Sequence, residues 1–261
     1  MNGAIATGAT GHLPRIALGA AVHVWQARTE CCDTPERRAY YTALLSDDER
    51  ARLQALAFDH LRMEFLLTRA LCRTALSAHA GVAPANWRFV RRQGGRPAIA
   101  DPHAALDLAF NLSNCATRVV CAVAAQTEVG VDIEQIASFR QEHDIVPQCL
   151  SERESAWLYA QPVSMRARSL CMLWTLKESY VKARGLGLAV PLRLCRFDLD
   201  GGRIVLELDP ALNDDASSWH FQTWQPDAHH CAALALRCRG NARLQVQWHD
   251  VTPDPGDHAY V

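Results

Sequence analysis

The chain contains the stretch Trp174-Thr175-Leu176-Lys177-Glu178-Ser179-Tyr180-Val181-Lys182, in which apolar residues recur with the period of an α-helix. We expect a helix at about Ala167–Arg184, closed by Gly185 and Gly187. Glu178 and Lys182 are four residues apart, so they lie on one face of that helix. Large apolar residues fill most of its circumference, which leaves the charged pair little access to water. Such a pair is either an ordinary helix ion pair or part of a functional site.

A second charged pair stands at the end of an apolar strand, in the sequence Gly130-Val131-Asp132-Ile133-Glu134. Residues two apart in a strand point to the same side, so Asp132 and Glu134 face one way while Ile133 turns into the core. Two convergent carboxylates repel each other unless a cation lies between them. A hard divalent ion such as Mg²⁺ favours oxygen ligands of this kind. The alternative is two solvated acids on an edge strand.

Positive charge is concentrated in one segment, although the whole chain carries a formal net charge of only −1. Between Arg50 and Arg96 the sequence has nine arginines against two acidic residues, a net charge of +7. Arginine binds phosphate through two parallel hydrogen bonds, so a compact polyanion is the sharper interpretation and a solvated helix face the plainer one. Nucleic acid lacks support because neither a recognised nucleic-acid motif nor an aromatic stacking platform accompanies the arginines.

The segment Phe110-Asn111-Leu112-Ser113-Asn114 places small polar residues at an expected strand end. Such residues can present backbone N–H groups and a hydroxyl to a phosphate. By itself the pattern predicts a simple turn equally well.

The remaining pattern mixes hairpins and helices without regular strand–helix alternation, which indicates an α+β fold. One helical period runs from Ser46 to Leu76, and a further helix is expected at about Glu152–Tyr159. Turns at 126–128 and at Gly201-Gly202 each predict a hairpin between the strands on either side. The expected strands are residues 21–25, 87–90, 108–112, 119–125, 129–134, 195–200, 203–208, 220–224, 232–236 and 244–248.

Composition excludes several classes of protein. The 261 residues are enough for one large or two small domains with an apolar core. The ten cysteines include no Cys-x-x-Cys pair, and several stand inside apolar runs. They are therefore expected to be buried free thiols of a cytoplasmic protein rather than zinc ligands or disulfides. We expect no secretory signal and no membrane segment, because no apolar stretch is long enough.

In this order and spacing the motifs resemble those of the 4′-phosphopantetheinyl transferases, in particular the long single-chain, Sfp-type members. The residues that carry the resemblance are Gly95-Arg96-Pro97, Phe110–Asn114, Gly130–Glu134 and Trp174–Lys182, followed by the glycine-rich Gly185–Leu188. The resemblance spans roughly Ser46 to Phe197. It implies two similar α+β halves related by a pseudo-two-fold axis, with the active site between them.

The resemblance also implies a division of labour. Residues 1–125 would form the half that binds the phosphates and nucleotide of coenzyme A. Residues 126–261 would carry the metal ligands and the catalytic helix. The enzyme is expected to act as a monomer on an acyl or peptidyl carrier protein, with neither nucleic acid nor membrane as a partner.

Site roles follow from the same resemblance. The Mg²⁺ ligands would be Asp132, Glu134 and Glu178, and the catalytic residues would be Asp132, Glu178 and Lys182, with Lys182 also meeting the pyrophosphate. The coenzyme A site would be formed by Arg52, Arg91, Gly95, Arg96, Asn111, Ser113, Asn114 and Lys182.

Two positions depart from the family pattern. Arg96 stands where the family has lysine, which keeps the charge and changes the reach. Asn114 stands where the family has histidine, and an amide cannot carry the positive charge that helps to hold phosphate.

The expected reaction moves the phosphopantetheine arm of coenzyme A onto a carrier serine and releases 3′,5′-ADP. Carriers of fatty-acid, polyketide and peptide synthesis all stay open. Two other functions explain part of the pattern: a metal-dependent hydrolase of coenzyme A or another nucleotide pyrophosphate, and a protein that binds coenzyme A without chemistry.

Overall fold

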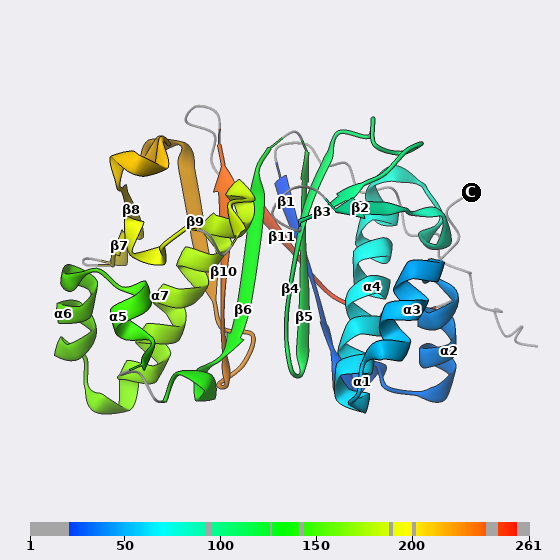
Figure 1. The fold of residues 1–261 in the computed structure, drawn as a ribbon, viewed down its shortest axis with the longest axis horizontal. Helices are drawn as coiled ribbons and strands as arrows, with labels where there is room; N and C mark the ends of the chain where they lie inside the picture. The colour runs from blue at the N-terminus through cyan, green and yellow to red at the C-terminus, as the bar shows by residue number, and fades with distance from the viewer. Residues whose placement is uncertain are drawn as a thin grey trace, which may run out of the picture.

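Two long helices enclose two β-sheets, so the chain is built in four layers (Figure 1). One sheet has the strand order β11-β1-β5-β4 and is covered by helix α4. The other has the order β6-β10-β9 and is covered by helix α7. The predicted α+β class is confirmed. The computed structural model describes residues 21–91, 96–125, 127–140, 144–187, 190–199, 202–238 and 245–254.

The bounds of the elements are as follows. The strands are β1 (Ala21–Arg28), β2 (Phe89–Arg91), β3 (Pro97–Ile99), β4 (Leu108–Cys115), β5 (Arg118–Ala125), β6 (Val129–Gln135), β7 (Cys195–Asp198), β8 (Val205–Leu208), β9 (Trp219–Trp224), β10 (His230–Arg237) and β11 (Gln245–Asp250). The α-helices are α1 (Thr29–Cys32), α2 (Pro35–Ala43), α3 (Asp47–Ala55), α4 (Asp59–Ala80), α5 (Val146–Cys149), α6 (Glu152–Ala160) and α7 (Val163–Arg184). Short 3₁₀ turns include η8 (Pro210–Leu212) and η9 (Ala216–Ser218).

Apolar side chains fill the space between the two sheets. Val24 and Ala122 from one sheet pack with Val131, Ile133 and Leu234 from the other, and all five are buried. Alternate residues of the same strands point the other way, toward α4 or α7, as the two-residue period of a strand requires. Ile133 thus lies in the core as expected, and Asp132 points to the opposite side of β6.

The two halves repeat one order of elements: strand, short capped helix, 22-residue helix, short hairpin and long hairpin. The short capped helices are α3 in the first half and α6 in the second, and each begins with a capping box. The glutamate of that box pairs with a buried cation of the following long helix. In the first half Arg73 binds Glu49, and in the second Lys177 binds Glu154 at 2.8 Å. Sequence identity does not reveal this repeat, because arginine in one half corresponds to lysine in the other.

The last strand crosses back to the first half. β11 pairs in parallel with β1, with Ala21 opposite Gln245 and Gln26 opposite Asp250. A division of the chain at residue 126 would place β11 with the second half, whereas its hydrogen-bonding partner belongs to the first.

Three expectations about local structure were wrong. The runs on either side of residue 126 do not form a hairpin, because β5 is already paired on both edges, by β1 and β4, while β6 pairs with β10. The helical period after Ser46 is two helices, since Leu56 and Phe58 adopt extended backbone and the Arg62 side chain binds the Leu56 carbonyl. The residues Phe110–Asn114 lie inside β4 rather than beyond a strand end.

All ten cysteines are free thiols, and most are buried. None of the helices in the described part of the chain combines the length and the apolar character that a membrane crossing would need.

Histidine side chains cluster where β11 meets β1 and α4. His23 is fully buried, and its Nδ1 lies 3.0 Å from Nε2 of His249. The His79 ring stands edge-on to it, with 4.5 Å between centroids. The pKa of His23 is lowered to about 4, first by burial and then by the neighbouring His79 and His249. Between about pH 6.5 and pH 4, His23 therefore stays neutral in the folded chain but binds a proton in the unfolded chain, where its pKa is 6.5.

We expect acid to weaken the fold through this cluster. The stability that depends on neutral His23 is complete above about pH 6.5 and is lost as the pH falls toward 4. The free energy of unfolding should drop by about 2 kcal/mol between pH 7 and pH 5 from His23 alone. Urea denaturation across this range measures the drop, and His23→Gln should flatten it. His60→Gln, on the exposed start of α4, is the control and should keep the wild-type slope; an unchanged slope in His23→Gln would contradict the assignment.

Candidate active site

The edges of the two sheets meet at β4 and β6, and polar side chains join them there. The Val131 N–H donates to Oδ1 of Asn111 at 3.0 Å, and the Ile133 N–H donates to Oγ of Ser113 at 3.3 Å. Both Asn111 and Ser113 are buried. Side chains of β4 thus satisfy the backbone of β6 where a regular sheet would use a neighbouring strand.

A lysine, a serine and an aspartate meet where β4 lies against β6, a contact that we call the seam. Lys182 Nζ lies 2.6 Å from Asp132 Oδ1 and 2.9 Å from Ser113 Oγ, and the Ser113 hydroxyl lies 2.9 Å from the same aspartate oxygen. Asp132 is almost completely buried, and its Oδ2 has no hydrogen-bond partner within the described ranges. An unpaired buried carboxylate oxygen is costly in an apo protein, so this atom is prepared to bind a cation or a donor.

Two further carboxylates face the same place. Glu134 follows Asp132 on the same side of β6, and Glu178 comes from α7 one turn before Lys182. Burial, followed by the charge of Asp132, raises the pKa of Glu134 to about 7. The same two causes raise the pKa of Glu178, and Lys182 only partly opposes them. The site therefore holds more negative charge than its one lysine can balance.

A pocket of about 690 Å³ opens beside this seam, between α3, α4 and β2. Arg52, Arg91 and Asn114 line it, as do the hydroxyl of Ser46 and the ring of Phe89. Further basic groups come from Arg69, Arg73 and Arg88, while Asp48 and Glu49 supply the acids. Glu49 forms ion pairs with Arg73 and Arg69. The positive charge that Glu49 does not neutralise therefore comes from Arg52, Arg88 and Arg91.

Asn114 is engaged at the boundary between this pocket and the seam. Its amide Nδ2 donates to Oε1 of Glu64, in a smaller pocket of about 230 Å³ that also contains Arg52. Burial raises the pKa of Glu64 despite this hydrogen bond. A phosphate that binds Asn114 must therefore displace or share the amide with Glu64.

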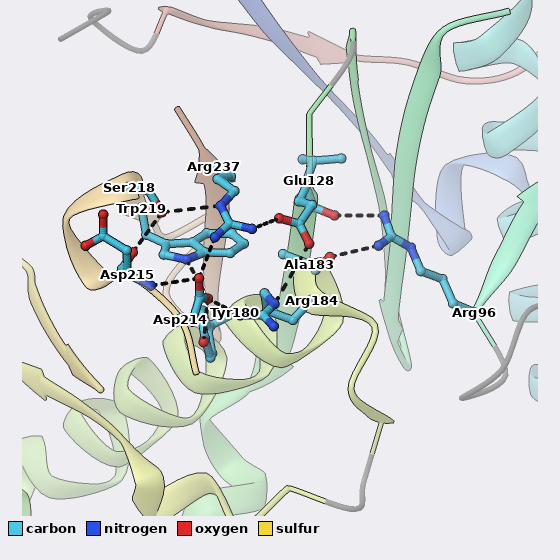
Figure 2. Close-up of polar contacts among 11 residues, drawn as sticks. Arg96, Glu128, Tyr180, Ala183, Arg184, Asp214, Asp215, Ser218, Trp219 and Arg237 are labelled. Atoms are coloured by element: carbon cyan, nitrogen blue, oxygen red, sulfur yellow. Dashed lines mark hydrogen bonds and ion pairs between the residues drawn. The ribbon is translucent and has the colours of Figure 1, made fainter. Parts of the chain in front are cut away.

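Arg96 does not line the pocket of about 690 Å³ described above, which we call the arginine pocket. Its guanidinium donates to the backbone carbonyl of Ala183 at 2.8 Å (Figure 2). It also donates to the carbonyls of Phe110 at 3.2 Å and Val129 at 3.3 Å. It thereby ties the end of α7 to β4 and β6. In this arrangement the planar donor group connects the two halves, and the expected role of Arg96 in phosphate binding stays a prediction.

The sequence matches the family model of the 4′-phosphopantetheinyl transferase superfamily over residues 128–235. It is 29% identical over 220 residues to 4′-phosphopantetheinyl transferase HetI of Nostoc sp., covering 84% of this chain and 89% of that protein. Over most of its length the chain is therefore similar in sequence to 4′-phosphopantetheinyl transferases, and over residues 128–235 to the model of their superfamily. It is also 27% identical to 4′-phosphopantetheinyl transferase Sfp of Bacillus subtilis, covering 76% of this chain and 85% of Sfp.

Among solved structures, the chain matches the holo-(acyl-carrier-protein) synthase from Bacillus anthracis str. Ames in complex with CoA (3′,5′-ADP). The match covers 42% of this chain and 94% of that one, with a TM-score of 0.37 and 18% identity.

The structure sorts the predicted site residues into three groups. Asp132, Ser113 and Lys182 are in direct contact, with Glu134 and Glu178 facing them. Arg52, Arg91 and Asn114 line the arginine pocket, and Asn111 holds β6 from within β4. Gly95 lies outside the described residues.

The carboxylates beside Lys182 fit a divalent cation by their chemistry. Asp132 offers an oxygen that has no partner among the described residues. Burial, followed by the charge of Asp132, raises the pKa of Glu134 and of Glu178, so a cation bound there would favour their charged forms. Over the described ranges, no three His, Cys, Asp or Glu side chains already enclose a metal site.

Sequence reasoning missed Glu49 and Glu64, which shape the phosphate side of the site. The capping-box pattern Ser46-x-x-Glu49 places Glu49 at a helix start and gives no sign that it also binds Arg73. No sequence signal connects Glu64 with Asn114, which is fifty residues away.

Gly130 sets the distance between β6 and α7. A Cβ atom there would lie 2.0 Å from the Ser179 carbonyl oxygen and 2.5 Å from the Ala183 nitrogen, which are both backbone atoms. Only glycine lets the helix lie close enough for Glu178 and Lys182 to reach Asp132.

We expect Gly130→Ala to push α7 away from β6 and to lower the free energy of unfolding by about 2–4 kcal/mol. Gly202→Ala is a useful comparison, because Gly202 has a φ of +73° and no atom within 4 Å of its added Cβ. Its cost comes from backbone strain alone, about 1 kcal/mol, and should leave the active site unchanged. Denaturant unfolding of both variants measures the difference; a Gly130→Ala protein as stable as wild type would contradict the close packing.

Proposed function

We propose that this chain transfers the 4′-phosphopantetheine group of coenzyme A to a serine hydroxyl of an apo carrier protein and releases 3′,5′-ADP. The observation that carries the proposal is the seam between β4 and β6. There Lys182 and three carboxylates, Asp132, Glu134 and Glu178, stand beside a pocket lined with arginines. Two relatives of the chain, HetI of Nostoc sp. and Sfp of Bacillus subtilis, are named 4′-phosphopantetheinyl transferases.

The arginine pocket binds the nucleotide end of coenzyme A in this proposal. Arg52 and Arg91 meet its phosphates, because a guanidinium fork matches phosphate oxygens. Asn114 contributes a neutral donor there, so phosphate affinity rests more heavily on the arginines than in relatives with histidine at this position. The first half of the chain thus supplies the nucleotide site and the second half the carboxylates.

Mg²⁺ would be held by Asp132, Glu134 and Glu178. When bound, it supplies positive charge that stabilises the negative charge developing on the pyrophosphate. Lys182 turns from Asp132 to the pyrophosphate and neutralises charge on the leaving 3′,5′-ADP. Ser113 and Asn111 keep β6 in place during this exchange, since their acceptor atoms remain bonded to its backbone.

The serine of the carrier attacks the β-phosphorus, and the bond from that phosphorus to the oxygen of 3′,5′-ADP breaks. The serine proton must leave as the new bond forms. Glu178 takes it at a carboxylate oxygen, directly or through a water, because burial raises its pKa above that of an ordinary glutamate. Metal binding reduces this basicity, so we assign Glu178 first as a ligand and second as a base.

The expected setting is the cytoplasm, where ten free thiols stay reduced. The partner is an acyl or peptidyl carrier protein, and the enzyme acts as a monomer. Carriers are generally acidic, and arginines that the phosphate pocket does not use are available to attract them.

The direct test is the intact mass of a panel of apo carriers after incubation with this protein, coenzyme A and Mg²⁺. A gain of one phosphopantetheine that disappears when Mg²⁺ is chelated is the expected result. Release of 3′,5′-ADP with no gain on any carrier would instead identify a hydrolase of coenzyme A. Binding of coenzyme A without cleavage would identify a binding protein.

Asp132→Asn should reduce transfer by at least about a hundredfold, because it removes the charge that both the metal and Lys182 need. The amide has almost the same shape, so unfolding by urea should show a folded protein. Glu152→Gln, on the exposed first turn of α6, makes the same chemical change away from the seam and should retain wild-type transfer. Full activity of Asp132→Asn would remove Asp132 from the mechanism.

A further inference from the structure

The last turn of α7 is held by one buried carboxylate, Asp214, which lies in the loop between η8 and η9. Its side chain is only 1% exposed. Oδ2 accepts hydrogen bonds from the Tyr180 hydroxyl and from the Trp219 indole, each at 2.9 Å, and forms an ion pair with Arg184. Oδ1 accepts from Arg237 and from the backbone N–H of Asp215.

Glu128 completes a ring of alternating charge around this carboxylate (Figure 2). It pairs with Arg237 and, at 3.9 Å, with Arg184. Two arginines and two acids therefore balance each other, and the guanidinium of Arg237 also lies over the Trp219 ring, 5.4 Å from its centroid. The ring has no surplus charge to attract a ligand, so its effect falls on the elements that it connects.

Among those elements α7 is the one that reaches the active site. Tyr180 and Arg184 are four residues apart and share one face of the helix. Lys182 lies midway between them in sequence, so it points from the opposite face, where Glu178 also lies. Asp214 thus binds the helix from behind, directly opposite the lysine that contacts Asp132 and Ser113.

Arg96 holds the same turn from the other half of the chain. It binds the carbonyl of Ala183, the residue after Lys182, and is anchored to β4 and β6 by two further carbonyls. Together Arg96 and Asp214 prevent the end of α7 from rotating or fraying. Helix ends fray readily unless their groups are bound in this way.

We propose that Asp214 is a positioning residue for Lys182: it grips Tyr180 and Arg184 and so fixes the direction in which the lysine leaves the last turn of α7. The inference rests on the proposed function, because it assumes that Lys182 meets the pyrophosphate of coenzyme A. Positioning of this kind matters for rate, since a displacement of about 1 Å can cost about a hundredfold.

The test is a double-mutant cycle with Asp214→Asn and Lys182→Gln. Asp214→Asn keeps the shape of the side chain, removes its charge and leaves two arginines less well held. In the wild-type background we expect kcat to fall by about tenfold to a hundredfold. In the Lys182→Gln background the same change should have little further effect, because the residue through which Asp214 acts is already missing.

Binding of coenzyme A provides a second readout that needs neither carrier nor metal. Calorimetry should show weaker binding in Asp214→Asn and no additional weakening when Lys182→Gln is present. Tyr180→Phe removes a single hydrogen bond to Asp214 and should give a smaller loss of the same kind in a protein that folds normally. This variant keeps the inference testable if Asp214→Asn fails to fold.

Asp215→Asn is the matched control. Asp215 is the neighbouring carboxylate, is exposed, and caps η9 through the Ser217 N–H without touching α7. It should leave kcat and the affinity for coenzyme A unchanged. An equal effect of Asp215→Asn, or an effect of Asp214→Asn that is the same with and without Lys182, would overturn the inference and leave a purely structural ion-pair ring.

Failure of the proposed function and failure of the positioning role of Asp214 would give different results. If wild-type protein binds coenzyme A but loads no carrier, the proposed function fails, and the cycle on the dissociation constant still tests the link from Asp214 to Lys182. If wild-type protein loads carriers while the cycle is additive, the function stands and the positioning role is wrong.

Discussion

The architecture depends on which groups accept hydrogen bonds from the backbone N–H groups of β6 along the edge that faces β4. A strand edge without a partner exposes N–H groups that cannot stay buried and unpaired. Here two side chains of β4, Asn111 and Ser113, provide the acceptors. Because this contact uses side chains rather than a backbone ladder, the two sheets stay separate, and the polar atoms needed for chemistry collect between them.

The residues with a short sequence spacing were predicted well. The helical period placed Glu178 and Lys182 on one face of α7, and the strand period placed Asp132 opposite the core residue Ile133. Long-range pairing was not predictable in the same way. The apolar runs of β5 and β6 look like a hairpin because a short turn joins them, yet each strand finds its partners far away in sequence.

Side-chain direction limited the prediction of the site as well. An arginine beside a glycine-rich turn suggests a phosphate contact, and the sequence gives no sign that the long side chain of Arg96 reaches three backbone carbonyls. Asp214 follows Asn213 in a polar loop that has the composition of any surface turn. Its burial and its five donors arise from tertiary packing, which composition does not encode.

The parallel pairing of β11 with β1 also means that the first sheet is completed late during synthesis. β1 is among the first strands to be synthesised, and Gln245–Asp250 is among the last. Until those residues leave the ribosome, one edge of β1 has no strand beside it, and the stacked rings of Trp25 and His249 cannot form. The first sheet is therefore complete only once β11 has been synthesised. A nascent or truncated protein without β11 would present an open strand edge on β1 that is prone to pair with another copy.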